Sequence, residues 1–145
     1  MKVILVTILL LLGGCNAMTT NHWKAPTEKD PHANIVAQED MDLMWVNDLP
    51  VNGWGYWTFE NFILPAGKSE VVMRARRGND HFALASFHVD LTEGEKYYFV
   101  NEVVGINYRI SLLDSNKQVI QVAVAPQQQF NESFTLPVVA IPRTN

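Results

Sequence analysis

The stretch EVVMRARRGNDHFALASFHVDL, residues 70–91, decides the fold, because it predicts two long β-strands joined by a tight turn. Its apolar residues recur at every second position, which places them on one face of an extended chain: Val71, Met73 and Ala75 before the turn, and Ala83, Ala85, Phe87, Val89 and Leu91 after it. Gly78, Asn79 and Asp80 supply the turn. The opposite face of the first strand is mostly charged, so we expect one dry face and one mostly solvated face.

Other short runs rich in β-forming residues flank this hairpin on both sides and are separated by turn residues. They cover residues 34–38, 41–47, 54–62, 96–104, 107–113 and 118–125. No run longer than a turn has helical periodicity. We therefore expect an all-β protein with a single antiparallel β-sandwich over residues 34–125. The C-terminal tail, residues 126–145, contains two prolines and either wraps a sheet edge or hangs free.

Two segments carry a resemblance to a known family. LPAGKSEVVMRAR, residues 64–76, and FHVDLTEGEKYYFV, residues 87–100, resemble the paired strands of PEGA-like and related transthyretin-like domains of small bacterial lipoproteins. Gly67 and Gly94 occupy tight turns, where glycine tolerates a positive φ. The resemblance covers residues 41–114 and implies a β-sandwich in which Tyr97 and Tyr98 brace the two sheets. It implies no catalytic residues.

The N-terminus has the features of a secretory signal. Lys2 precedes an apolar run, residues 3–12, which is too short to span a bilayer and is followed by Gly13, Gly14 and Cys15. This order resembles the lipobox of bacterial lipoproteins. The resemblance implies that residues 1–14 are removed and that Cys15 carries a covalent diacylglycerol and an acyl chain, with no other cofactor. The alternative is a free cysteine within an ordinary cleaved signal.

The lipobox reading also predicts where the protein resides. Asn16 follows the cysteine, where an aspartate would favour inner-membrane retention, so the resemblance favours the outer membrane of the bacterial cell envelope. Residues 15–33 are polar and lack periodicity, which predicts a lipidated N-terminus followed by a flexible tether. Cys15 is the single cysteine, so the folded part must be stabilised by its core and not by disulfides.

The charge of the chain argues against a nucleic-acid partner. Its formal net charge is −4, and its one basic cluster is Arg74, Arg76 and Arg77. Proteins that bind nucleic acids need a basic face to neutralise phosphates. We expect these arginines to lie at a solvated edge or to contact lipid headgroups.

The tryptophans are the main candidates for a binding site. Trp45, Trp54 and Trp57 lie within thirteen positions and, if exposed, could stack on the apolar faces of sugar rings. If buried, they would simply fill one end of the sandwich. Packing is the commoner use of aromatic side chains, so we favour it.

Three sequence patterns could indicate catalysis or metal binding, but the spacing of their residues fits neither. Ser86, His88 and Asp90 alternate along one strand, so their backbones stand about 6.6 Å apart, too far for a nucleophile to bond its base at about 3 Å. The four histidines lack the spacing of a metal site. The acidic residues Glu39, Asp40, Asp42 and Asp48 lack the rhythm of a calcium loop and are expected to form a solvated face.

These observations predict a non-catalytic, lipid-anchored protein of the cell envelope that docks to another envelope component, either a protein or a glycan. The first alternative is a glycan-binding module that uses the tryptophans. Less favoured are a small hydrolase and a subunit that adds a strand to the sheet edge of a partner.

Overall fold

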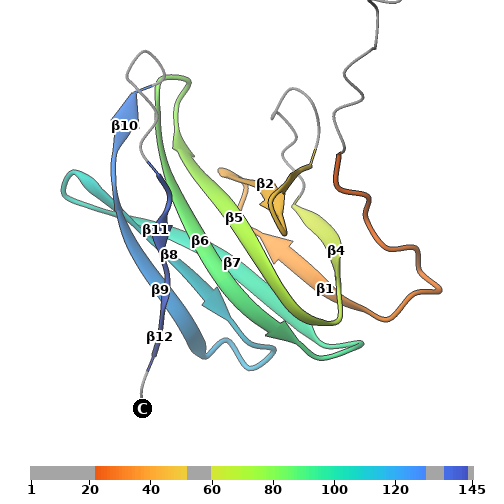
Figure 1. Ribbon diagram of the computed structural model, residues 1–145. Coiled ribbons are helices and arrows are strands. Elements are labelled where there is room, and N and C mark those ends of the chain that lie inside the picture. Colours follow the sequence, from red (N-terminus) through yellow and green to blue (C-terminus); the bar gives the residue numbers. More distant parts are fainter. Residues whose placement is uncertain (1–21, 52–59, 130–135, 144–145) are drawn as a thin grey trace, which may run out of the picture.

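The computed structural model describes residues 22–51, 60–129 and 136–143, and every regular element in these ranges is a β-strand (Figure 1). The strands are β1 (His32–Ala37), β2 (Met41–Val46), β3 (Leu49–Pro50), β4 (Asn61–Pro65), β5 (Gly67–Arg77), β6 (His81–Leu91), β7 (Lys96–Val104), β8 (Asn107–Leu113), β9 (Val119–Pro126), β10 (Gln128–Gln129), β11 (Val138–Val139) and β12 (Ile141–Pro142). Within these ranges no helix has the length and apolarity needed to cross a membrane. The predicted signal, residues 1–14, lies outside them.

The strands form two sheets, which confirms the all-β prediction. The first sheet has the order β12-β9-β8-β7-β1-β4, and the second has the order β10-β6-β5-β2-β3, with β11 also paired to β6. Most neighbouring strands are antiparallel as expected, but β1 runs parallel to β7 and β11 runs parallel to β6. Neither pair is joined by a hairpin, so the chain connection does not force an antiparallel direction.

The predicted hairpin of residues 70–91 is confirmed and forms the longest ladder among the described strands. β5 and β6 pair from Gly67 opposite Leu91 to Arg77 opposite His81. β5 starts at Gly67, earlier than predicted. Only Ala66 separates it from β4, so the chain passes almost directly from the first sheet to the second. Gly67 has a φ of 92° at this crossing and Gly94 has a φ of 77°, which confirms the positive φ expected at both positions.

The core lies between the two sheets and is built from the inward positions of the long strands. Phe87 of β6 meets Phe99 of β7 edge to face, with ring centroids 5.1 Å apart. The expectation that Tyr97 and Tyr98 both brace the sheets is wrong for Tyr98. Tyr97 is buried in the core, whereas Tyr98 lies on the opposite face beneath the Lys117 ammonium. Consecutive residues of a strand point to opposite faces, so only one of the two can enter the core.

The C-terminal segment wraps the sheet edges, which settles the alternative left open for its described residues. β10 and β11 pair with β6, and β12 pairs with β9 of the other sheet. Between them, the Ala140 N–H donates to the Ser86 carbonyl at 2.7 Å. Figure 1 shows β11 and β12 in dark blue, beside β6 and β9. The segment therefore links the second sheet to the first at one side of the sandwich.

Tyr108 is a buried polar side chain that the core does not satisfy. It is fully buried on β8, and its hydroxyl has no hydrogen-bond partner within the described part of the chain. Burial raises the pKa of the Tyr108 phenol above its ordinary value, because the charged form would lose its hydration. An unsatisfied buried hydroxyl destabilises the folded state by about 1–3 kcal/mol.

We therefore expect Tyr108→Phe to raise the free energy of unfolding by about 1–2 kcal/mol at neutral pH, measured by urea denaturation. Above about pH 10 the unfolded phenol ionises while the folded one stays neutral, so the parent chain should lose further stability as the pH rises, and the variant should lose less. Tyr98→Phe is the matched control at a partly exposed site and should change little. A clear loss of stability in Tyr108→Phe would show that the hydroxyl has a favourable partner.

Candidate functional site

The outward face of the second sheet carries a second apolar cluster, contrary to the mostly solvated face that the sequence predicts. Val72 of β5 and Phe82 and Leu84 of β6 are buried there, and Met44 and Trp45 of β2 pack against them. These three positions point away from the main core because their neighbours along each strand point into it. The face is therefore partly apolar, and side chains from three adjacent strands cover one another on it.

A buried ion pair lies next to this cluster and corrects two further expectations. The Asp42 Oδ2 atom accepts hydrogen bonds from Arg74 Nε at 2.9 Å and from Arg74 Nη2 at 2.6 Å. The Nε of Arg76 lies 2.8 Å from the same oxygen, as a charge contact and not as an aligned hydrogen bond. Asp42 and Arg74 are 2% and 4% exposed. Asp42 is thus no part of a solvated acidic face, and Arg74 is not at a solvated edge.

The β2–β3 hairpin positions one side of the site. Asn47 and Asp48 both have positive φ, 49° and 64°, and form a two-residue turn between β2 and β3. The turn is tied to β5, because the Asn47 Oδ1 accepts from the Glu70 N–H at 2.8 Å and the Asn47 N–H donates to the Glu70 carbonyl at 2.8 Å. The hairpin therefore holds Asp48 close to Glu70 of the sheet face.

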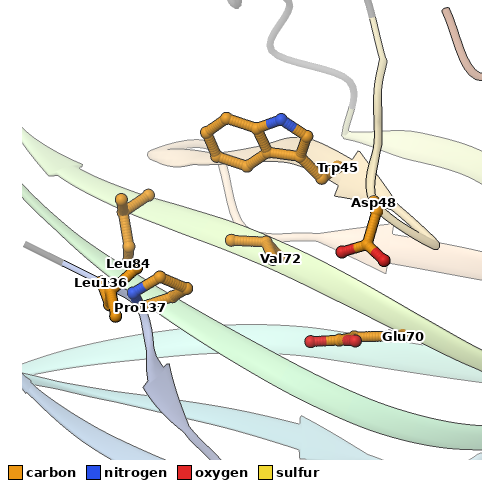
Figure 2. Close-up of a pocket in the computed structure, with 7 residues that line it drawn as sticks. All are labelled: Trp45, Asp48, Glu70, Val72, Leu84, Leu136 and Pro137. Atoms are coloured by element: carbon orange, nitrogen blue, oxygen red, sulfur yellow. The ribbon is translucent and has the colours of Figure 1, made fainter.

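A groove of about 540 Å³ lies on this outward face, and Figure 2 shows the side chains that line it. Among the described residues, its lining comes from three parts of the chain: Trp45 and Asp48 from the β2–β3 hairpin, Glu70, Val72 and Leu84 from β5 and β6, and Leu136 and Pro137 from the segment before β11. Figure 2 shows the carboxylates of Asp48 and Glu70 at one end, and Leu84, Leu136 and Pro137 at the other. The groove is thus acidic at one end and apolar at the other.

Glu70 is held in place at the acidic end of the groove. Its Oε1 atom accepts a hydrogen bond of 2.6 Å from the hydroxyl of Ser86, which lies on the neighbouring strand β6. Ser86 is buried, and the cross-strand register of β5 and β6 brings the two residues together on one face. This bond fixes one carboxylate oxygen and orients the side chain across the groove floor.

The predicted site residues fall in different parts of the chain. Trp45 lines the groove and is partly exposed, so it both packs on the second cluster and presents part of its indole to the groove. Trp54, Trp57 and Cys15 lie outside the described residues. The structure therefore brings one of the three candidate tryptophans into the site.

Sequence reasoning missed most of the groove. Val72 and Leu84 are apolar residues at outward positions of strands, and this break in the alternation was the available signal. Glu70 and Asp48 were assigned to solvated positions. Leu136 and Pro137 belong to the predicted tail, residues 126–145, and no local pattern could place them beside β5 and β6.

The other polar candidates are arranged as follows. The Ser86 hydroxyl is bonded to Glu70, while the side chains of His88 and Asp90 are exposed on the same strand. His81 lies 3.3 Å from the side-chain amide of Gln129. Across the described ranges, no three side chains of histidine, cysteine, aspartate or glutamate converge in a way that could hold a metal ion.

The buried ion pair makes a prediction about stability. Asp42→Asn removes the negative charge beside the buried Arg74 guanidinium and should lower the free energy of unfolding by about 3–5 kcal/mol in urea denaturation. Glu102→Gln is the matched control, because the Arg109–Glu102 pair is 3.1 Å long but exposed on both sides. Loss of this exposed pair should lower the free energy of unfolding by less than about 1 kcal/mol. Equal effects of the two substitutions would contradict the role given to burial.

Comparisons of the chain with protein-family models, with curated proteins and with solved structures give no match.

Proposed function

We propose that this protein is a non-catalytic, lipid-anchored component of the bacterial cell envelope that docks another envelope component in the groove on the outward face of the second sheet. The observation that carries this proposal is the groove itself. Its volume of about 540 Å³ lies within the range of ligand sites, which are concave and mostly apolar with a few polar groups. The groove has this composition, because a half-buried tryptophan and two carboxylates lie beside an apolar floor.

The anchor and the compartment rest on the N-terminal sequence. A positive charge, a short apolar run and Gly13-Gly14-Cys15 support a lipobox, and Asn16 supports the outer membrane. Two or three acyl chains on Cys15 would supply a durable anchor, since one chain alone binds a bilayer only marginally. The two-sheet architecture is compatible with the PEGA-like or transthyretin-like domain that the strand motifs resemble.

A glycan-binding module is the second candidate, and one observation favours it. Trp45 presents part of its indole to the groove, where a sugar ring could stack on it. Trp45 would then carry most of the affinity, and the two carboxylates would accept hydrogen bonds from hydroxyl groups of the sugar.

The anchor is tested by Cys15→Ser in the native host. We expect the parent chain to incorporate labelled palmitate and to sediment with membranes, and the variant to lose the label and the membrane association. Thr19→Ser, a change of similar size near the same terminus, should behave like the parent chain. Membrane sedimentation of unlabelled Cys15→Ser would contradict the lipid anchor.

Docking is tested by crosslinking the full-length protein in native membranes and analysing the captured proteins and glycans. Leu136→Glu places a charge on the groove wall at a side chain that is 89% exposed, so the fold should tolerate it. We expect this variant to lose the main crosslinked species. The matched control is Ile106→Glu, at a residue of the β7–β8 turn that is 79% exposed and does not line the groove. Retention of the same species by Leu136→Glu and by Trp45→Ala would exclude the groove as the docking site.

A further inference from the structure

The groove has an unbalanced charge at one end. In the described part of the protein the ion pairs are Arg74–Asp42, Arg76–Asp42 and Arg109–Glu102, so neither Asp48 nor Glu70 belongs to one. Arg74 and Arg76 on this face already contact Asp42. Two other basic residues lie beside Glu70 and share a separate hollow with it: Lys68 precedes it on β5 and His88 is opposite it on β6. Neither forms an ion pair with Glu70 within the described residues or lines the groove. Two carboxylates that line one groove without a paired cation create a negative potential, which attracts a positively charged group from outside.

The rest of the groove requires an apolar group from the same ligand. Val72 forms the floor between the carboxylates and the far end, where Leu84, Leu136 and Pro137 lie (Figure 2). Leu136 is 89% exposed, so a ligand that covers it would remove apolar surface from water. A ligand that combines an apolar part with a cation would therefore match both ends of the groove.

A lysine or arginine side chain combines the two properties that the ends of the groove favour. Its aliphatic stem can lie along Val72 and the Trp45 indole, while its charged head reaches Asp48 or Glu70. The indole face adds a favourable contact with the cation. A neutral glycan offers no charge for the carboxylates, and an anionic lipid headgroup would be repelled by them.

We infer that the occupant of the groove is an extended polypeptide segment in which a lysine or arginine is next to apolar side chains. The basic side chain occupies the acidic end at Asp48 and Glu70, and a neighbouring apolar side chain covers Leu84, Leu136 and Pro137. This inference rests on the proposed docking function and names the partner as a protein with a basic, apolar segment.

The test uses the full-length chain, labelled with ¹⁵N in detergent micelles, and follows its amide and indole signals by NMR. The probes are the peptide acetyl-Leu-Val-Lys-Val-Leu-amide, the same peptide with glutamate in place of lysine, and a tetramer of N-acetylglucosamine. We expect the lysine peptide to shift the signals of Trp45, Val72 and Leu84 in a saturable way. The glutamate peptide should bind at least about tenfold more weakly, because it places a third negative charge among the carboxylates.

Variants of the two carboxylates locate the charge contact. Glu70→Gln and Asp48→Asn should each weaken the lysine peptide about threefold to fivefold, and an increase in salt should weaken binding to the parent chain more than binding to either variant. Glu93→Gln is the matched control, because Glu93 is an exposed acid in the turn between β6 and β7 and does not line the groove. This control should bind the lysine peptide like the parent chain.

Three results would overturn the inference. Equal binding of the lysine and glutamate peptides, with no effect of the carboxylate variants, would show that charge does not select the ligand. Shifts of the Trp45 signals with the sugar tetramer alone would make the occupant a glycan. An absence of shifts with every probe at millimolar concentration would also reject the peptide. The crosslinking experiment in native membranes tests the proposed docking function separately. That function stands if Leu136→Glu loses the main crosslinked species, whatever the peptides do.

Discussion

The register between β5 and β6 is the constraint on which the rest of the structure depends. Eleven residue pairs hold it, from Gly67 and Leu91 to Arg77 and His81. Side chains alternate between the two faces with a period of two, so a slip of β5 by one residue would move Val71 and Met73 from the core to the outside. The same slip would bring Glu70 and Val72 into the core. The main core and the outward groove are therefore set by one pairing.

A charged pair on the outward face fixes the neighbouring register, between β2 and β5. Asp42 of β2 pairs directly with Arg74 of β5 in the sheet, and its carboxylate binds the guanidinium of the same residue. A buried ion pair contributes little net stability, because both charges lose their hydration. It does penalise arrangements that separate the partners, since each charge would then be buried alone. The pair is therefore best understood as fixing how β2 lies on β5, and through β2 the positions of Trp45 and Asp48.

The sequence predicted the strands well and the groove poorly. The bounds predicted for β7 and β8, residues 96–104 and 107–113, agree with the structure, because period-two alternation and turn residues are local signals. Burial on the outward face could not be predicted in this way. Asp42 and Arg74 are far apart in the sequence, and both look like solvated residues until the sheet pairs them. Leu136 depends in the same way on the return of the C-terminal segment to β6, which no local pattern encodes.

The return of the C-terminal segment gives the groove a wall whose position depends on edge pairing. Val138 and Val139 pair with Ala85 and Ser86 on the outer edge of β6, and this pairing places Leu136 and Pro137 beside Leu84. Fraying of two-residue strands at a sheet edge is a low-energy local opening. A ligand that contacts Leu136 binds only the paired form, so its binding free energy also stabilises the link between the two sheets. Occupancy of the outward face and closure of the sandwich are therefore thermodynamically coupled.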